Sequence, residues 1–458
     1  MTKMIVLSNR TAADTGLRAG GLAVAVFDAL KSSNGVWLGW SGTVSENAPR
    51  GVSFINSDGV DYVLSDLSQR EFDGYYLHYA NRMIWPVFHY RVDLAQFGQD
   101  EFDTYKSVNQ RFADLALTQA RDGDVIWVHD YHFLMAAESL RQRGWNGRVG
   151  FFLHIPFPSP EIFRALPQHQ WLARAMAQYD VVGFQTERDL WNFRHYMEDD
   201  CDATLGEDGA ISVFGRTLTA RAYPIGIDPE AFSAAAESEP ATHAAKRIGR
   251  FLGEKRHLII GVDRMDYSKG LPERFEAVGQ LFDQYKDVHG AVSYTQITPP
   301  SRSKVEEYQV LRTELDGLAG RINGDYGDLD WIPIRYLARA YGRDELAGLF
   351  RIARVGLVTP LRDGMNLVAK EFVAAQNPED PGVLILSEFA GAAEQLKDAI
   401  LVNPHDYGQV ADAIYHALQM PRERRIELWR ALWDNISSHD ISWWRRRFLD
   451  DLNPPHPA

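Results

Sequence analysis

Short apolar runs recur along the whole chain and constrain its fold more than any other feature. They lie at residues 4–7, 125–128, 149–153, 181–184, 258–262, 355–358 and 383–386. None shows a clean alternation of apolar and polar residues, and each ends in polar, glycine or proline residues. Strands buried on both faces of a parallel sheet have this pattern. Helical patterns separate the runs, for example at residues 273–285 and 343–354, so the sequence predicts an α/β protein with parallel sheets.

The chain has 458 residues, and its composition changes near the middle. Residues 228–241 (DPEAFSAAAESEPA) are small and polar, and a basic segment with a helical pattern follows them. We therefore expect two α/β domains of similar size, at residues 1–235 and 236–440. Residues 441–458 contain an aromatic and basic helix and a short tail, which we expect to return to the first domain.

The formal charge of −14 and the single cysteine exclude several classes of protein. An acidic chain is not expected to have nucleic acid or an anionic membrane surface as its partner. One cysteine rules out a disulfide framework and a cysteine-based zinc site, and acidic neighbours are expected to raise the pKa of Cys201. The start, MTKMIVLSNR, lacks the layout of a signal peptide, and no run approaches the roughly 20 apolar residues of a membrane-spanning helix. We therefore expect a cytoplasmic protein.

Two cations follow the apolar run at residues 258–262. Arg264 and Lys269 lie in the sequence VDRMDYSKG. Ligands of open α/β sheets bind beyond the carboxyl ends of the strands, so these side chains are candidates for a binding site. In an acidic chain such a cluster is not a by-product of a basic surface, although a solvated surface pair is the alternative. Fixed cations of this kind bind phosphate groups.

Asp363 and Glu371 flank a glycine turn that opens a predicted helix, in the sequence DGMNLVAKE. A helix beginning near Asn366 leaves free backbone amides at Met365, Asn366 and Leu367, and these favour an anion. The two carboxylates are suited to sugar hydroxyls, so together with the two cations they predict a site for a phosphorylated sugar donor. The alternative is that Asp363 caps the helix and Glu371 pairs with a nearby lysine.

Further candidates follow the strands predicted in the first domain. Arg10 follows the first strand, and Gly20 and Gly21 would let backbone amides approach a phosphate at a helix N-terminus. Asp130 and His154 each follow another predicted strand. Asp130 is suited to sugar hydroxyls, with a helix cap as the alternative. His154 lies in a loop that three prolines make rigid, and a structural role is its alternative.

Aromatic residues and one more cation complete this set. Tyr76 and Trp85 lie in an aromatic-rich stretch, where they could contact a sugar phosphate or pack in the core. Arg302 lies in the second predicted domain, where it follows another predicted strand. His129 and His132 flank Asp130, and Asp-x-Asp triplets occur at residues 200–202 and 328–330. No third cluster of ligands with suitable spacing accompanies the histidines, and the triplets lie in loop-like surroundings, so we expect no metal site.

Taken together, these motifs resemble those of the trehalose-6-phosphate synthase family. The matching segments are SNR at 8–10, AGGL at 19–22, GWSG at 39–42, YY at 75–76, WPVFHYR at 85–91, HDYH at 129–132, HIPFP at 154–158, DRMDYSKG at 263–270, SR at 301–302, GRING at 320–324 and LRDGMNLVAKE at 361–371. Members of this family are retaining glycosyltransferases. The resemblance implies a GT-B fold, in which two Rossmann-like domains with parallel sheets face one another across a deep cleft.

The resemblance also implies a role for each candidate residue. The donor nucleotide sugar would be held by Gly21, Arg264, Lys269, Met365, Asn366, Leu367 and Glu371, and the acceptor by Arg10, Tyr76, Trp85, Asp130 and Arg302. Arg264, Lys269, His154 and Asp363 would act at the reacting groups. The N-terminal domain would bind the acceptor and the C-terminal domain the nucleotide sugar.

The activity that the resemblance implies is glucose transfer to glucose 6-phosphate with retention, giving α,α-trehalose 6-phosphate. UDP-glucose is the expected donor, with GDP-glucose or ADP-glucose as alternatives, and no metal cofactor is expected. No carboxylate nucleophile is apparent, so a front-face reaction with the donor phosphate as base is expected. The resemblance further implies a homo-oligomer, either a dimer or a tetramer. The alternatives are a transferase with another acceptor such as glycerol 3-phosphate, a nucleotide-sugar epimerase, or a catalytically silent sugar-phosphate sensor.

Overall fold

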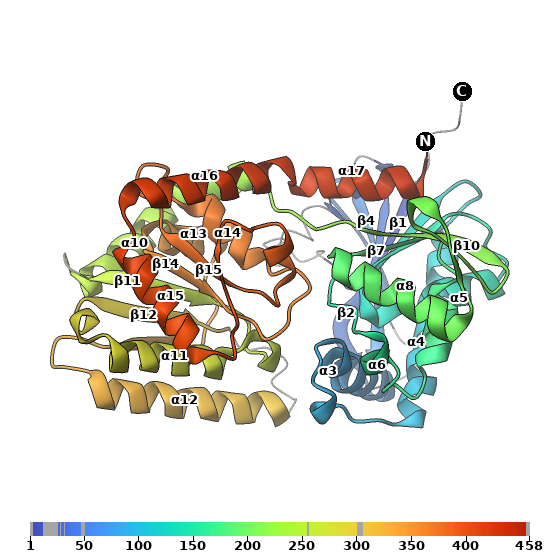
Figure 1. Ribbon diagram of the computed structural model, residues 1–458. Coiled ribbons are helices and arrows are strands. Elements are labelled where there is room, and N and C mark those ends of the chain that lie inside the picture. Colours follow the sequence, from blue (N-terminus) through green and yellow to red (C-terminus); the bar gives the residue numbers. More distant parts are fainter. Residues whose placement is uncertain are drawn as a thin grey trace. The chain divides into compact units, whose positions relative to one another are not determined.

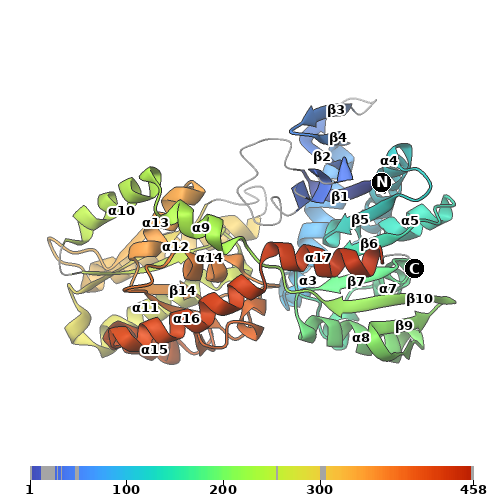
Figure 2. The same cartoon turned by 90° about the horizontal axis from the view of Figure 1, so that it is seen from above.

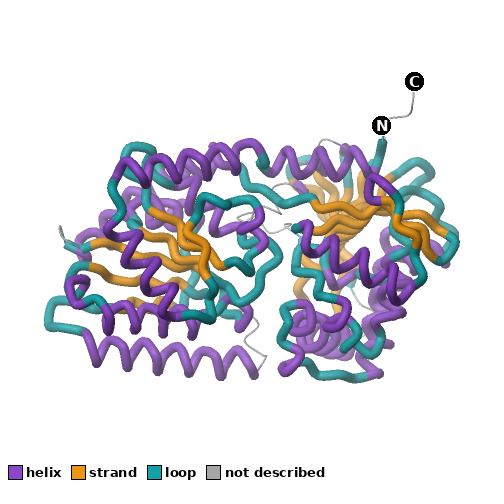
Figure 3. The backbone as a smooth tube through the Cα atoms, viewed as in Figure 1, coloured by secondary structure: helices purple, strands orange, loops and turns teal. Residues whose placement is uncertain are grey.

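The computed structural model describes residues 3–11, 26–27, 29–31, 33–46, 51–253, 256–299 and 306–454. The chain forms two compact units, and each is described by itself (Figure 1). The first consists of Met1–Ile225 together with Ile441–Ala458, and the second of Gly226–Asp440. In each unit a sheet is packed between helices (Figure 3).

The first unit has a ten-stranded sheet among its described residues. Its strands lie in the order β3 (Val52–Ser57), β4 (Val60–Ser68), β2 (Val36–Ser45), β1 (Met4–Arg10), β5 (Val125–His129), β6 (Val149–Phe152), β7 (Val181–Phe184), β10 (Arg216–Ala222), β9 (Ala210–Val213) and β8 (Thr204–Leu205). The strands from β4 to β10 pair in parallel, and β3, β9 and β8 pair antiparallel at the two edges. The strand order reverses at β1, and this is where ligands of open α/β sheets bind.

Helices of the first unit connect these strands. They are α2 (Gln69–Glu71), the π-helix η2 (Phe72–Ile84), α3 (Trp85–Phe88), α4 (Gln99–Gln119), α5 (Ala136–Gln142), α6 (Pro160–Phe163), α7 (His169–Met176), α8 (Glu187–Cys201) and α17 (Ile441–Leu452), with short 3₁₀ turns η3 (Val92–Leu94), η4 (Tyr131–Phe133) and η5 (Glu207–Gly209). A capping box between Ser68 and Glu71 begins α2, which continues into η2. π-Helices are rare and occur often at functional sites.

The second unit has a six-stranded sheet among its described residues, and all of its strands are parallel. The order is β13 (Ile334–Leu337), β12 (Val292–Ile297), β11 (His257–Val262), β14 (Val355–Val358), β15 (Val383–Ser387) and β16 (Ile400–Val402). Numbered along the chain within the unit, this is the order 3-2-1-4-5-6 of the dinucleotide-binding fold, and it reverses between β11 and β14.

Helices cover both faces of the second sheet. They are α9 (Pro229–Ala236), α10 (Glu239–Leu252), α11 (Leu271–Gln284), α12 (Glu306–Tyr326), α13 (Arg343–Ile352), α14 (Leu367–Ala375), α15 (Tyr407–Gln419) and α16 (Arg422–Ser438), with 3₁₀ turns η6 (Tyr267–Lys269), η7 (Lys286–Val288) and η8 (Gly391–Glu394). Helices α10 and α13 pack together, and α11 packs against α12 and α15. Figure 2 shows α10 and α13 on one side of this sheet and α11 and α15 on the other.

The units divide between Ile225 and Gly226, whereas the sequence analysis placed the boundary after residue 235. The reason is packing: α9 lies against α13 and α14 and therefore belongs to the second sheet. Helix α17 packs on the first unit, where Trp444 is fully buried with its ring 5.4 Å from that of Trp127. Asp451 accepts hydrogen bonds from Arg221 at 2.7 Å and from Tyr223 at 2.6 Å.

The predicted α/β class with parallel sheets is confirmed, and each of the seven apolar runs overlaps a parallel strand. The antiparallel edge strands were not predicted. Strand β3 (VSFINS) has exposed side chains along most of its length, so it lacks the apolar run by which the central strands were recognised.

Candidate active site

Arg10 ends β1 in the first unit. Its guanidinium carbon lies 5.2 Å from the centre of the Trp40 ring. Gly42 has a φ of +93°, and a Cβ at this position would lie 2.6 Å from Nη1 of Arg10. A larger residue would therefore be strained and would displace the guanidinium. Arg10 is exposed, so its charge is available to a ligand.

Helix η2 separates two neighbouring tyrosines into different surroundings. Tyr75 is fully buried, and its hydroxyl donates to Oδ1 of Asn9 at 3.0 Å. Tyr76 is only partly buried, with its ring 5.2 Å from Trp40 and 5.9 Å from His132. Tyr75 thus supports the core, whereas Tyr76 joins the aromatic surface next to Arg10.

Trp85 lies at the start of α3, where Pro86 fixes the first turn. Only 4% of Trp85 is exposed, and its ring packs against His89 at 4.1 Å and Tyr131 at 5.6 Å. The structure thus buries the Trp85 side chain in the core, the alternative considered in the sequence analysis.

Asp130 follows β5 in an unusual backbone conformation, with φ 72° and ψ 166°. Its N–H donates to the carbonyl of Phe152 at 2.8 Å, and its Oδ1 accepts a hydrogen bond from the His154 N–H at 3.3 Å. Non-glycine residues rarely adopt such a conformation, and those that do cluster at active sites. The sheet therefore holds Asp130 and His154 side by side.

Burial determines the charge of His129, which precedes Asp130 in the chain, and of His154, whose backbone N–H contacts Asp130. It lowers the pKa of His154 to about 3, and burial together with His154 lowers the pKa of His129 well below its usual value. Both rings are therefore neutral at physiological pH. A neutral imidazole offers one donor and one acceptor to its surroundings.

In the second unit, Lys269 and Asp363 form a salt bridge between the loops that follow β11 and β14. Asp363 also accepts a hydrogen bond from the Asn366 amide at 3.0 Å. Asn366 has a φ of +73° and stands at the N-cap of α14. The predicted helix start near Asn366 is confirmed, and the backbone amides of its first turn lie next to the Lys269–Asp363 pair.

The buried side chain of Arg274 joins these loops by hydrogen bonds. The sequence analysis did not identify this residue. It is 1% exposed and donates to Asp263 at 2.7 Å, Thr359 at 2.9 Å and the carbonyl of Lys269 at 3.2 Å. Gly270 supports the same turn with a φ of +62°, where a Cβ would lie 2.5 Å from the Thr359 carbonyl. Within a helical pattern Arg274 has no feature that distinguishes it from a surface arginine, and only its contacts reveal this role.

Arg264 and Glu371 are two further residues of this unit that the sequence analysis predicted for the donor site. Arg264 is exposed beyond β11. Burial raises the pKa of Glu371 to about 7, with Arg343 acting in the opposite direction. The neighbouring Lys370 donates to Gln395 at 2.6 Å, so the lysine next to Glu371 has another partner. The side chain of Glu371 is therefore partly ionised and partly neutral near pH 7.

Two predicted site residues, Gly21 and Arg302, lie outside the described residues. The sequence also singled out Cys201 and the two Asp-x-Asp triplets. Burial, followed by the charge of Asp200, raises the pKa of Cys201 to about 11, so a thiolate is disfavoured as expected. Asp200 pairs with Arg164 at 2.7 Å, and Asp330 pairs with Arg256 at 2.9 Å.

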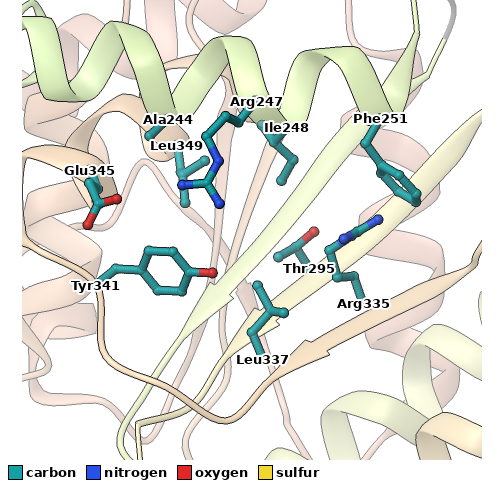
Figure 4. Close-up of a pocket in the computed structure, with 10 residues that line it drawn as sticks. All are labelled: Ala244, Arg247, Ile248, Phe251, Thr295, Arg335, Leu337, Tyr341, Glu345 and Leu349. Atoms are coloured by element: carbon teal, nitrogen blue, oxygen red, sulfur yellow. The ribbon is translucent and has the colours of Figure 1, made fainter.

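A pocket of about 130 Å³ lies in the second unit between α10, α13 and the strands β12 and β13 (Figure 4). Its lining combines Arg247, Arg335 and Tyr341 with apolar side chains. None of the predicted donor or acceptor residues lines it. The cluster around Lys269 and Asp363 is therefore a separate feature of this unit.

The described residues contain no group of three or more His, Cys, Asp or Glu side chains that could hold a metal ion. Within the same part of the chain, no helix is both long enough and apolar enough to cross a membrane.

The fold and the site define a class of protein. Two α/β units with parallel sheets, and charged side chains at the carboxyl ends of their strands, make up a GT-B glycosyltransferase. A family model described as "Glycosyltransferase family 20" matches residues 3–454. The chain belongs to this family.

Similar proteins are known from several bacteria. The chain is 44% identical over 459 residues to a trehalose-6-phosphate synthase of Enterobacter sp. (strain 638), covering 100% of this chain and 96% of that protein. It is similar to an α,α-trehalose-phosphate synthase (UDP-forming) from Burkholderia xenovorans in complex with glucose-6-phosphate, with a TM-score of 0.95, 44% identity and coverage of 98% and 99%. A trehalose-6-phosphate structure from E. coli, bound with UDP-2-fluoro glucose, has a TM-score of 0.95, 44% identity and coverage of 100% of both chains.

Proposed function

We propose that this glycosyltransferase transfers glucose from UDP-glucose to glucose 6-phosphate with retention, giving α,α-trehalose 6-phosphate and UDP. The observation that carries the proposal is the cluster at the carboxyl ends of β11 and β14, where Lys269 and Asp363 meet the N-terminus of α14. A cation and free helix amides suit a diphosphate, and a carboxylate suits sugar hydroxyls. The relatives with UDP-2-fluoro glucose and glucose-6-phosphate support these two substrates.

The second unit binds the donor in this proposal. Arg264 and Lys269 hold the diphosphate, together with the first amides of α14 at residues 365–367. Gly21, which the resemblance assigns to the donor, lies outside the described residues. Glu371 accepts hydrogen bonds from the ribose hydroxyls. Asp363 binds the transferred glucose, and His154 of the first unit contributes to the same sugar. The support is local: Asn366 and Lys269 both contact Asp363 and fix its orientation.

The first unit binds the acceptor. Arg10, Tyr76 and Trp85 hold its phosphate, and Asp130 accepts hydrogen bonds from its sugar hydroxyls. Arg302, proposed for the same phosphate, belongs to the second part of the sequence and lies outside the described residues. The exposed Arg10 guanidinium beside the aromatic surface of Trp40 and Tyr76 supports this assignment. Only 4% of Trp85 is exposed, which leaves little of its surface for contact with the acceptor.

The reaction proceeds on one face of the donor sugar. The bond between the anomeric carbon and the UDP oxygen breaks, and the acceptor hydroxyl forms the new bond on the same face. The hydroxyl proton passes to the departing phosphate oxygen, so no carboxylate nucleophile is needed. Arg264 and Lys269 stabilise the charge that develops on the diphosphate, and the remaining catalysis is positioning.

We also propose that the protein acts in the cytoplasm as a homo-oligomer, either a dimer or a tetramer, and needs no metal cofactor. The acidic charge of −14 supports a small-molecule substrate over nucleic acid or an anionic membrane.

The decisive experiment offers glucose 6-phosphate with UDP-glucose, GDP-glucose and ADP-glucose in parallel reactions that contain EDTA. Formation of trehalose 6-phosphate from UDP-glucose is the expected result. Preference for another nucleotide would correct the donor, and loss of activity in EDTA would contradict the absence of a metal requirement. If a nucleotide sugar binds but no product forms, another acceptor or a sensing role would replace the proposal.

A further inference from the structure

Three neighbouring strands of the first unit each have a polar side chain at their carboxyl ends, and two of these side chains are buried while that of His154 is partly buried. His129 ends β5, His154 follows β6, and Gln185 directly follows β7. Nδ1 of His129 lies 3.0 Å from Nε2 of His154, and Nδ1 of His154 lies 3.5 Å from Nε2 of Gln185. The three side chains therefore form one continuous row across the carboxyl ends of these strands.

The backbone fixes the orientation of the Gln185 amide. Oε1 of Gln185 accepts a hydrogen bond from the Ile225 N–H at 3.0 Å, and Gln185 is only 2% exposed. The amide nitrogen of Gln185, Nε2, can donate hydrogen bonds but not accept them, and it must then face His154. A flipped amide would leave the Ile225 N–H without its acceptor, which is costly for a buried group.

This orientation decides which nitrogen of His154 carries the proton. Nδ1 of His154 faces a donor, so it must be the acceptor nitrogen of the neutral ring. The hydrogen is then on Nε2 and is donated to Nδ1 of His129. His129 in turn carries its own hydrogen on Nε2, which is buried and has no hydrogen-bond partner among the described residues. The opposite arrangement would place the Nδ1–H of His154 against the amide hydrogens of Gln185.

The surroundings hold this row in place. His129 is 1% exposed, and its ring lies 4.4 Å from that of Trp127. Phe152 packs on His154 at 4.7 Å, and Trp444 from α17 lies 6.3 Å away. Burial lowers the pKa of both histidines, so neither ring gains a second proton at neutral pH.

We propose that Gln185 and His129 are positioning residues, which hold His154 as the Nε2–H tautomer and leave its Nδ1 as a hydrogen-bond acceptor for the transferred sugar. The contact with the sugar rests on the function proposed above, whereas the tautomer does not. At 3.5 Å the bond from Gln185 is long, so a sugar hydroxyl that approaches more closely can donate to the same nitrogen. His154 would then select donors that have a hydroxyl at this point.

The test replaces the hydrogen-bond donor that faces Nδ1 of His154 with an acceptor. In Gln185→Glu a carboxylate, which only accepts, faces Nδ1 of His154 and should move the proton to that nitrogen. We would record ¹⁵N spectra of the full-length protein labelled at histidine, without substrates, and assign His154 by its absence in His154→Asn. The expected result is protonated Nε2 in the unaltered protein and protonated Nδ1 in Gln185→Glu. Protonated Nδ1 in the unaltered protein, or no change on substitution, would overturn the proposal.

Kinetics with two further variants separate positioning from general stability. His129→Asn places an amide near the former Nδ1 and can still accept from His154, whereas His129→Leu cannot. We expect kcat to fall up to roughly 100-fold in His129→Leu, with partial recovery in His129→Asn and an unchanged KM for glucose 6-phosphate. Equal losses in both variants would contradict the positioning role. If the enzyme fails to glucosylate glucose 6-phosphate, the spectra still decide the tautomer, so the two proposals fail separately.

Discussion

Lys269 forms a salt bridge with Asp363, and this contact joins the loop after β11 to the loop after β14 within the second unit. Both side chains are largely buried, with 11% and 13% of their surface exposed. Removing one partner of a buried pair of this kind is strongly destabilising, because the other charge is left buried without its counter-charge. The pair therefore couples the residue proposed to hold the diphosphate to the residue proposed to hold the sugar.

Lys269→Ala should lower kcat by roughly 10²-fold, because it removes a charge that stabilises the departing diphosphate. Arg264→Ala should have a similar effect. Initial rates at saturating substrates measure both changes. Arg312→Ala, which removes an exposed cation from α12, is the control and should retain normal turnover. Near-normal turnover in Lys269→Ala would contradict the front-face mechanism.

Glu371 should make donor binding depend on pH. Its pKa of about 7 lies above the usual value, so the fraction of neutral carboxyl rises as the pH falls through 7. A neutral carboxyl accepts hydrogen bonds less strongly, so the KM for UDP-glucose should rise between about pH 8 and about pH 6.

Glu371→Gln provides the comparison for this pH dependence. It should show a raised KM for UDP-glucose that no longer changes over this range. Glu276→Gln, at an exposed carboxylate paired with Arg321, should keep the pH profile of the unaltered enzyme. A pH profile that survives in Glu371→Gln would assign the titration to another group.

Arg10→Ala should raise the KM for glucose 6-phosphate by roughly ten- to a hundredfold, as expected for the loss of charged hydrogen bonds worth about 1.5–3 kcal/mol. The affinity for UDP-glucose should stay the same. Unphosphorylated glucose at high concentration serves as the matched acceptor, because its use should not depend on Arg10. Equal losses with both acceptors would show that Arg10 does not recognise the phosphate.

Arg274→Met should lower the free energy of unfolding by about 3–5 kcal/mol, since it leaves the buried Asp263 carboxylate without its counter-charge. Urea denaturation measures the change. Arg321→Met removes the exposed pair with Glu276 and should cost no more than about 1 kcal/mol. Adding Asp263→Asn to Arg274→Met should restore part of the lost free energy of unfolding. If it does not, the loss would be attributed to altered packing and not to the unpaired carboxylate.

Several parts of the structure were predictable because their signal is local. The apolar runs identified the parallel strands, since a strand buried on both faces needs apolar residues at successive positions. The turn before α14 was predictable from the segment between Asp363 and Glu371, because asparagine tolerates the left-handed conformation that Asn366 adopts at the start of this helix. The sequence did not indicate the π-helix η2, which directs Tyr75 inward and leaves Tyr76 partly exposed.

By itself, the sequence determined the fold class and the kinds of side chain at the strand ends, since both depend on neighbouring residues along the chain. Only the tertiary structure decided which of these side chains meet. Arg274 became the support for Lys269 and Asp263 because the ends of β11, β12 and β14 converge on it. His129, His154 and Gln185 became one row because β5, β6 and β7 are adjacent in the sheet. A hydrogen bond forms only when its donor and acceptor lie about 3 Å apart, and the order of residues along the chain does not specify such distances between residues far apart in sequence.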